Sequence, residues 1–383
     1  MTNIKTATII GSGVGGLCAA IALRQAGIDA HVYEKADLLG DVGAGLVIWS
    51  NAIRALRMLG LADDALHAGA TLQRGEISTA TGRVMKRTDL ASHQRLYSEP
   101  TAAIHRAALS RVLLARLPAN AIHLNQKCER VEQDAGGATA HFADGSSTRA
   151  DLLIGADGIR SAVRGQFFPN VALRYSGYTA WRGVVQTKDE SALGITSETW
   201  GRGARFGIVR MDAERVYWFA TANAPAGSLV PQAQRKTTLL ALFGGWHSPI
   251  PQLLAATPDE AFLQNDIYDI PPMKSWSAGR VTLLGDAAHA TTPNMGQGAC
   301  MAIESAVVLA RCLADGASVE AALREYERIR QPRTAWVTRQ SWQLGQVGQI
   351  ENPLLRAARD AVFSLLPAST MNAQLAQALG GFE

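Results

Sequence analysis

The residues best suited to chemistry begin with a glycine-rich turn and the carboxylate that follows it. Gly11, Gly13 and Gly16 fit the pattern G-x-G-x-x-G, and Glu34 comes later, with Lys35 beside it. Such glycines permit a tight turn and let a backbone approach a pyrophosphate, while the carboxylate accepts hydrogen bonds from a ribose hydroxyl. The pattern predicts a dinucleotide site; the alternative is a plain glycine-rich turn.

The elements around this turn favour the dinucleotide site. Residues 6–10 are apolar and β-branched, which predicts a buried strand. Residues 17–26 are helix formers ended by Gly27, and residues 29–34 read as a second strand. A strand, a helix and a second strand ending in an acidic residue form the βαβ unit that binds dinucleotides.

A second segment decides which dinucleotide is expected. Residues 279–286 predict a short buried strand that ends in Gly285 and Asp286, where ligands of open α/β sheets bind. A long helix is predicted over 299–314, and its start offers free N–H groups and a positive dipole end that suit the electron-rich edge of a flavin. FAD is therefore favoured over NAD, although a helix-capping or turn role is the alternative for Asp286. The residues expected to line the flavin are Pro293, Gly296, Gln297 and Gly298.

Two further elements lie between these segments. Residues 151–161 predict a strand, a turn at Asp157-Gly158 and the start of a helix. Arg106 stands at the head of a predicted helix over 107–117. Both are candidates for the same site.

The motifs Gly-Ser-Gly-Val-Gly-Gly at 11–16, Gly-Ala-Asp-Gly at 155–158 and Gly-Asp-Ala-Ala-His at 285–289 occur in an order and spacing that carry a resemblance. The chain resembles the class A, p-hydroxybenzoate hydroxylase-like, FAD-dependent aromatic monooxygenases over nearly its whole length. Within them it is most similar to the compact branch of urate, salicylate and 3-hydroxybenzoate hydroxylases. The resemblance implies that Glu34 holds the adenosine ribose, that Arg106 and Asp157 contact FAD, and that Asp286 holds the ribityl chain.

The resemblance also implies the reaction. Non-covalent FAD, reduced transiently by NADH or NADPH, reacts with O2, and a flavin C4a-hydroperoxide hydroxylates a small aromatic or N-heteroaromatic ring. A second dinucleotide fingerprint is missing, since Gly201-Arg-Gly203 is followed by Phe206 rather than glycine. The alternatives are a flavin-dependent oxidoreductase without oxygen transfer, an antibiotic-modifying hydroxylase and a non-catalytic flavin redox sensor. Which ring is hydroxylated and at which position, and which nicotinamide is used, stay open.

Arg205 and Tyr217 are the candidates for the substrate pocket, because relatives carry an arginine and a tyrosine at matching positions. Arg205 would hold a carboxylate or oxyanion, and Tyr217 would hydrogen-bond a ring oxygen. A four-residue turn over 211–214 would place the two on opposite faces of the sheet, whereas a three-residue turn or a bulge would place them on one face. In the first case the pocket would include Phe206 and Ile208 instead.

The predicted fold is α/β: a Rossmann-like FAD domain interleaved with a smaller α+β substrate domain on an antiparallel sheet, followed by a helical C-terminal region. The FAD domain is assigned to residues 1–71, 99–174 and 263–345, and the substrate domain to 72–98 and 175–262. Residues 72–98 include an expected hairpin, with strands over 71–79 and 83–88. Residues 346–383 form the C-terminal segment, where the apolar stripe of 354–366 is interpreted as a core or subunit face.

Composition limits the other functional classes. Hydrophobic residues make up 47% of the 383, charged residues 18%, and the net charge is +4 without a basic run, which argues against disorder and nucleic-acid binding. The four cysteines have no metal-ligand spacing, so no metal site is expected. No signal peptide or membrane span is predicted, and a cytoplasmic monomer or homodimer is expected.

Overall fold

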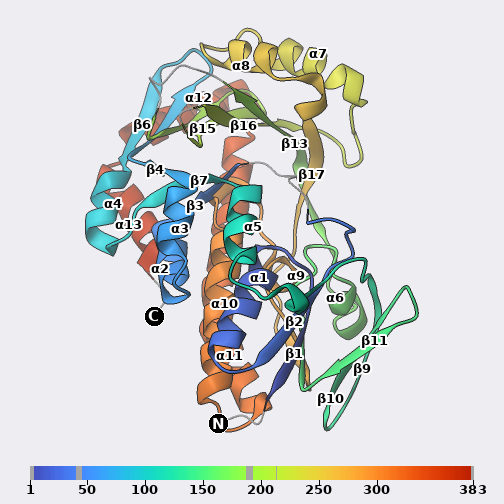
Figure 1. The fold of residues 1–383 in the computed structure, drawn as a ribbon. Coiled ribbons are helices and arrows are strands. Elements are labelled where there is room, and N and C mark those ends of the chain that lie inside the picture. Colours follow the sequence, from blue (N-terminus) through green and yellow to red (C-terminus); the bar gives the residue numbers. More distant parts are fainter. Residues whose placement is uncertain (1–3, 40–44, 187–192, 213, 381–383) are drawn as a thin grey trace.

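The computed structural model describes residues 4–39, 45–186, 193–212 and 214–380. Figure 1 shows two sheets at opposite ends of the molecule, with long helices running between them. The predicted α/β class, with a dinucleotide-type sheet, a second sheet and a helical C-terminal region, is confirmed.

The first sheet has the strand order β18-β19-β12-β1-β2-β8. Its strands pair in parallel except for β18 with β19. Their bounds are β1 (Thr6–Ile10), β2 (Asp29–Tyr33), β8 (Ile122–His123), β12 (Leu152–Gly155), β18 (Ser277–Ala278) and β19 (Val281–Leu283). Helix α1 (Val14–Gln25) and helix α10 (Gly298–Asp315) pack together against this sheet. Both helix starts therefore meet the carboxyl ends of parallel strands, where the predicted cofactor residues lie.

Short elements surround the first sheet. A separate antiparallel sheet is formed by β9 (Cys128–Asp134), β10 (Gly137–Phe142) and β11 (Ser147–Ala150). The nearby helices are η1 (Ala119–Ala121), α6 (Ala162–Phe167), α9 (Asp286–His289) and η3 (Pro293–Met295). All four cysteines are buried and free, as expected of small apolar residues.

The second sheet has the order β17-β13-β16-β15-β14-β5-β6. Its strands are β5 (Arg74–Thr79), β6 (Val84–Asp89), β13 (Arg174–Gln186), β14 (Ile195–Trp200), β15 (Ala204–Arg210), β16 (Arg215–Asn223) and β17 (Leu263–Asp269). It is antiparallel apart from the parallel pair β5–β14. Helices α7 (Gln232–Phe243) and α8 (Ile250–Ala256), followed by η2 (Asp259–Ala261), cover one face, as Figure 1 shows.

A three-stranded sheet lies between the two larger ones. It contains β3 (Gly45–Ile48), β4 (Gly69–Leu72) and β7 (Thr101–His105) in the order β3-β7-β4. The expected hairpin strand over 71–79 is therefore wrong at its start, because residues 71 and 72 pair with β7 instead. Helices α2 (Ser50–Met58), α3 (Ala62–His67), α4 (Leu90–Tyr97) and α5 (Arg106–Leu114) accompany this sheet.

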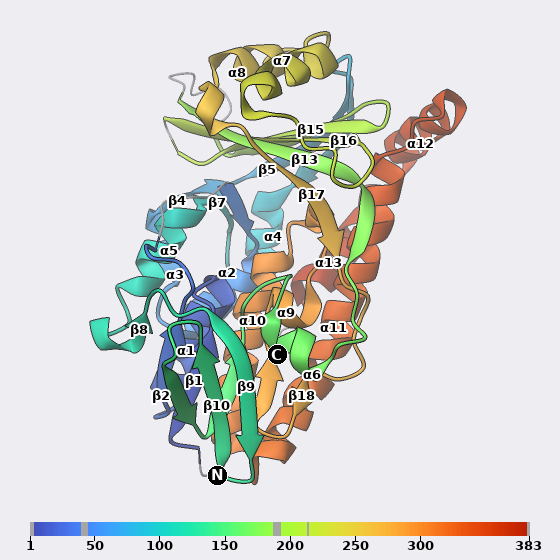
Figure 2. The ribbon, with the colours of Figure 1, turned by 90° about the vertical axis from the view of Figure 1, so that its right-hand side faces the viewer.

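The C-terminal region contains α11 (Val319–Gly348), α12 (Pro353–Leu365) and α13 (Ala368–Gly380). Figure 2 shows α11 running the length of the molecule and α12 extending away from the body. The apolar stripe of α12 is not part of this chain's core, since Leu354 is 80% exposed and Leu365 is 82% exposed. The core interpretation of that stripe is wrong, and the subunit face stays a prediction. Among the described residues no helix is long and apolar enough to cross a bilayer.

Candidate active site

The first glycine turn is shaped by backbone contacts. Gly11 has φ +105°, and a Cβ placed on it would lie 2.5 Å from the carbonyl oxygen of Ala156. A Cβ on Gly16 would lie 2.0 Å from the carbonyl oxygen of Gly11. Gly13 has nothing within 4 Å of its Cβ position. The turn is thus closed on two sides and open at Gly13, which fits the close approach of a pyrophosphate.

The Glu34 carboxylate holds the glycine turn in place and can also accept a hydrogen bond from a ligand. Its Oε2 accepts hydrogen bonds from the amide and hydroxyl of Ser12, both at 2.8 Å, and its Oε1 accepts from the amide of Ala36 at 3.0 Å. Burial opposes ionisation, but these hydrogen bonds and the charge of the exposed Lys35 prevail, so the pKa of Glu34 is lowered. A carboxylate has about four acceptor positions. One position on Oε1 therefore stays available for a ribose hydroxyl.

Asp286 meets two arginines at the first turn of α9. Its side chain reaches solvent, yet the surrounding protein desolvates the carboxylate enough to raise its pKa, against the attraction of Arg106 and Arg164. The structure therefore brings together Asp286 and the predicted Arg106. An exposed carboxylate beside two arginines can accept hydrogen bonds from hydroxyl donors, which is what a ribityl chain supplies.

Arg164 is a site residue that the sequence reasoning missed. It is buried in α6, and its guanidinium donates to the carbonyl oxygen of Ala287 at 3.0 Å. Burial lowers its pKa, while Asp157 and Asp286 favour its charge. The available signal was its place one turn into the helix that follows the Asp157-Gly158 turn.

Asp157 caps the helix that carries Arg164. Its Oδ2 accepts hydrogen bonds from the amides of Ala162 at 2.7 Å and Val163 at 3.2 Å. Its Oδ1 is buried without a partner among the described residues. An unpaired buried acceptor beside Gly11 fits a bound polar group, so the contact of Asp157 with FAD stays a prediction with a structural basis.

The predicted flavin loop ends in the start of α10, as expected. Gly296 adopts φ +62°, and its Cβ position lies 3.0 Å from the indole nitrogen of Trp49. Gln297 is buried and hydrogen-bonded to Asn51, and Gly298 opens the helix. The loop therefore leads into the first turn of α10, where a helix offers N–H groups without intrahelical partners and a positive dipole end. These features, with Asp286 and the first glycine turn, fit FAD.

Arg205 and Tyr217 share one face of the second sheet. Arg210 pairs with Val216, and the amide of Met211 donates to the carbonyl of Arg215, so the hairpin turn has three residues rather than four. Val209 then pairs with Tyr217 and lies on the same face as Arg205. The opposite-face alternative is wrong.

The opposite face of this sheet is core. Phe206 and Ile208 pack with Trp218, Leu239 and Phe243 beneath α7 and α8. The alternative pocket that includes Phe206 and Ile208 is therefore excluded.

Arg205 is buried, with 2% of its side chain exposed, and belongs to a network of hydrogen bonds. It donates to Gln349 Oε1 at 2.9 Å, to Glu198 Oε1 at 3.0 Å and to Asn294 Oδ1 at 2.6 Å. Asn294 belongs to η3 and also accepts from the hydroxyl of Tyr178. Arg205 thus joins the second sheet to the predicted flavin loop, and its charge is paired with Glu198.

Tyr217 lies in an apolar cluster four strand positions from Arg205. Its ring covers Gly45, whose Cβ position is 2.6 Å from the ring. Burial raises the pKa of Tyr217, against the nearby charge and hydrogen bond of Arg182. Its hydroxyl therefore stays protonated. The cluster consists of Leu72, Leu90, Ala103, Val209, Met211 and Tyr217, with Val47, Trp49, Val184 and Phe219 packed against it.

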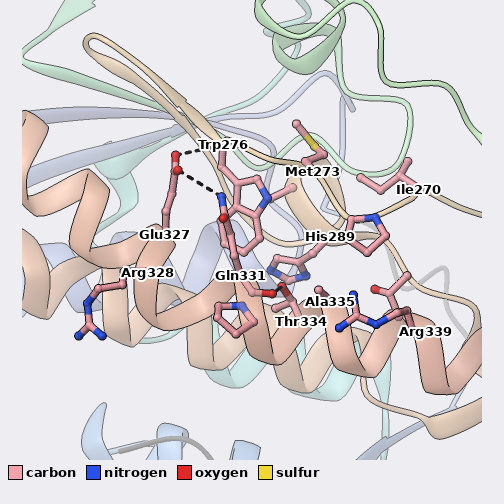
Figure 3. A pocket seen from close by; sticks show the side chains of 14 residues that line it. Ile270, Met273, Trp276, His289, Glu327, Arg328, Gln331, Thr334, Ala335 and Arg339 are labelled. Atoms are coloured by element: carbon pink, nitrogen blue, oxygen red, sulfur yellow. Dashed lines mark hydrogen bonds between the residues drawn. The ribbon is translucent and has the colours of Figure 1, made fainter.

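A cavity of about 420 Å³ lies elsewhere, between α9, α11 and the segment that includes Met273 and Trp276 (Figure 3). Its lining includes His289 but not Asp286, Arg205 or Tyr217. This cavity is therefore separate from the predicted cofactor and substrate residues. His289 Nε2 lies 3.1 Å from the hydroxyl of Ser305, and burial, followed by Arg330, lowers its pKa to about 3. This histidine stays neutral and structural. No cluster able to hold a metal occurs within the described part of the chain.

Comparisons with known proteins agree with this geometry. The family described as FAD binding domain matches residues 4–194 and 271–341. The chain is 42% identical to aurachin C monooxygenase/isomerase of Stigmatella aurantiaca over 96% of both chains. It is 33% identical to 2-heptyl-3-hydroxy-4(1H)-quinolone synthase of Pseudomonas aeruginosa over 94% of both. The crystal structure of Klebsiella pneumoniae HpxO with FAD and uric acid superposes with a TM-score of 0.92 at 31% identity, covering 99% of this chain and 97% of that one.

Proposed function

Because the chain belongs to the FAD binding domain family and is an FAD-dependent monooxygenase of aromatic or N-heteroaromatic rings, we propose a narrower substrate class for it. The substrate is an uncharged, fused bicyclic N-heteroaromatic ring that bears an apolar substituent. A quinolone with an alkyl chain is the type compound.

The observation that carries this proposal is the pairing of Arg205 with Glu198 beside an apolar cluster. An anionic ring needs an unpaired cation to replace its hydration. Arg205 lies in an ion pair with Glu198 at 3.0 Å, so it offers an anion little net charge. The side chains packed around the ring of Tyr217 are apolar, with Arg182 reaching only its hydroxyl, and this lining favours an alkyl substituent over a carboxylate.

The relatives support the same class. Uric acid, present in the HpxO structure, and the quinolone named for the Pseudomonas enzyme are both fused bicyclic N-heteroaromatic rings. The name of the second compound adds a heptyl chain. The alkyl-quinolone enzyme matches this chain over 94% of both sequences.

Bound FAD, once reduced by NAD(P)H, activates O2 for transfer to the ring. Glu34 and Asp286 hold the ribose and ribityl hydroxyls, and the start of α10 faces the electron-rich flavin edge. Tyr217 keeps its proton and donates a hydrogen bond to a ring oxygen, while Arg182 supplies a hydrogen bond to the tyrosine. Arg205 holds Asn294, and with it the loop beneath the substrate. Contact of these residues with cofactor and substrate is part of the proposal.

Substrate-stimulated oxidation of NADH and NADPH tests the proposal. We expect 2-heptyl-4(1H)-quinolone to stimulate oxidation and to be hydroxylated, with urate and salicylate weaker. Turnover of urate with the quinolone inert would contradict the substrate class. NAD(P)H oxidation without a hydroxylated product from any tested ring would favour the oxidoreductase alternative.

A matched pair of variants tests the role of the ion pair. Glu198→Gln leaves Arg205 as an unpaired cation and is expected to lower the KM for urate relative to the quinolone. Glu76→Gln is the control, because Glu76 has a similarly covered side chain and pairs with Arg74 and Arg87 on a neighbouring strand. Equal effects of the two variants on the KM ratio would contradict the argument.

The assembly and location stay as the sequence predicts: we propose a cytoplasmic monomer or homodimer. The exposed stripe of α12, with Leu354, Leu355, Val362 and Leu365, is the face that a second copy would cover. Light scattering of the purified protein, with Leu365→Glu as the comparison, distinguishes the two states.

A further inference from the structure

A fully buried carboxylate stands behind the predicted flavin loop, outside the groups that the proposed reaction uses. Glu304 of α10 is 0% exposed, and three side chains make four contacts with its two oxygens. Oε1 accepts from Asn51 Nδ2 at 2.6 Å and from Arg333 at 2.7 Å. Oε2 accepts from Arg333 Nε at 2.7 Å and pairs with Arg330 at 2.6 Å. Three hydrogen bonds and one ion pair therefore hold this carboxylate in place.

The Glu304 carboxylate sets the orientation of two side-chain amides, Asn51 and then Gln297. An ionised carboxylate only accepts hydrogen bonds, so Asn51 must turn its NH2 group toward Glu304. The same NH2 group donates to Gln297 Oε1 at 3.1 Å. In return, the NH2 group of Gln297 donates to Asn51 Oδ1 at 3.5 Å, so the charge of Glu304, two side chains away, orients the Gln297 amide. Asn51 and Gln297 are both buried, so water does not compete for these bonds.

The opposite end of this network holds the C-terminal helix. Arg333, which grips Glu304 with two hydrogen bonds, also donates to the carbonyl oxygens of Gln377 at 3.1 Å and Ala378 at 2.7 Å. Arg54 of α2 donates to the carbonyl oxygen of Leu379 at 2.5 Å. Cations at a helix C-terminus interact favourably with its unpaired carbonyls. Figure 1 shows α13 lying beside α2, so Arg54 fastens it to the helix that carries Asn51, and Arg333 fastens it to α11.

We propose that Asn51 and Glu304 are positioning residues that set Gln297 and the start of α10 for the flavin, and that through Arg333 they couple this loop to α13. Burial opposes ionisation of Glu304, but the two arginines and Asn51 outweigh it and lower its pKa, so the carboxylate keeps the charge that fixes the amides. Binding of FAD at the loop and ordering of α13 then favour each other.

A double-mutant cycle on FAD affinity tests the first half of the proposal. Asn51→Leu cuts the link while leaving Glu304 paired with both arginines, and Gln297→Leu removes the group that is positioned. Each variant is expected to raise the dissociation constant of FAD, measured by titration of the apoprotein, about threefold to tenfold, the loss of one hydrogen bond. The double variant should be no weaker than Gln297→Leu alone, because Asn51 acts only through Gln297. Effects that multiply would overturn the proposal.

A matched control separates positioning from folding. Gln264→Leu removes an equally well bonded amide from β17, where it binds Val230, Thr179 and Ser228. It should lower the melting temperature about as much as Asn51→Leu and leave the FAD dissociation constant unchanged. If Asn51→Leu also leaves that constant unchanged, its role is structural only and the proposal is wrong.

Hydrogen exchange tests the link to the C-terminal helix. In the unaltered protein, addition of FAD should slow amide exchange in α13 as well as around residues 296–300. In Asn51→Leu the protection of α13 should be lost while protection of the first glycine turn persists. Equal protection of α13 by FAD in both proteins would contradict the coupling.

Discussion

Replacing Arg205 with methionine is expected to destabilise the protein by about 3 kcal/mol. Breaking one partner of a buried ion pair costs about 3–5 kcal/mol, mainly because the other charge is left uncompensated. Glu198 is the partner, and since 22% of its side chain is exposed, the lower end of that range applies. The Glu198 carboxylate would keep a hydrogen bond from the indole N–H of Trp200 at 3.0 Å.

The other contacts of Arg205 add little to this cost. Gln349 Oε1 still accepts from the hydroxyl of Thr221, and Asn294 Oδ1 still accepts from Tyr178. Removing both charges, in Arg205→Met with Glu198→Gln, should therefore recover most of the loss. The loosened contact to Asn294 should remain in both variants and divert NAD(P)H oxidation into peroxide.

Urea denaturation of the FAD-loaded variants measures the first effect, and peroxide released per NAD(P)H consumed measures the second. A single variant within about 0.5 kcal/mol of the unaltered protein would refute the reasoning, since that is the scatter of ordinary surface substitutions. A double variant as unstable as the single one would also refute it, because the cost would then not come from the uncompensated carboxylate.

Three further predictions concern the cofactor site and pH. Asp286→Ala and Glu34→Ala should each weaken FAD binding, measured by titration of the apoproteins, by about 1–3 kcal/mol. Melting of the apoproteins should show that only Glu34→Ala also destabilises the fold, because Glu34 holds the amides of Ser12 and Ala36 whereas the side chain of Asp286 is exposed. Gly16→Ala should abolish the yellow colour of the purified protein, because its Cβ would lie 2.0 Å from a backbone oxygen, and a retained flavin spectrum would contradict this. Burial, followed by the charge of Arg330, lowers the pKa of His289 to about 3. Below its pKa of about 6.5 in the unfolded chain, the unfolded protein therefore binds a proton that the folded protein does not. Stability should therefore fall by roughly 1.4 kcal/mol per pH unit as pH drops below that value, and His289→Gln should flatten the slope in denaturation series between pH 5 and 6.5.

The cofactor half of the site could be predicted from the sequence because its chemistry is local. Gly11 and Gly13 join β1 to α1, Gly16 lies in the first turn of α1, and Asp286 comes three residues after the end of β19, so spacing alone indicates their geometry. The helix predicted over 299–314 begins at Gly298 and ends at Asp315 for the same reason.

The substrate half depends on contacts that spacing does not encode. Whether Arg205 and Tyr217 share a face turns on one residue of the hairpin, since a single register step inverts every side chain of a strand. The partners of Arg205 come from residues 198, 294 and 349, which are far apart in the chain. Glu304 and Asn51 likewise read as ordinary helical positions until α2, α10 and α11 pack together.

The most direct test of the account is incorporation of labelled oxygen. The purified protein, given NADH or NADPH, 2-heptyl-4(1H)-quinolone and ¹⁸O₂, is analysed by mass spectrometry. The account predicts a product heavier than the substrate by one ¹⁸O atom, with pyridine nucleotide consumed in proportion. Nucleotide consumption that yields only peroxide, or a product whose oxygen comes from water, would contradict it.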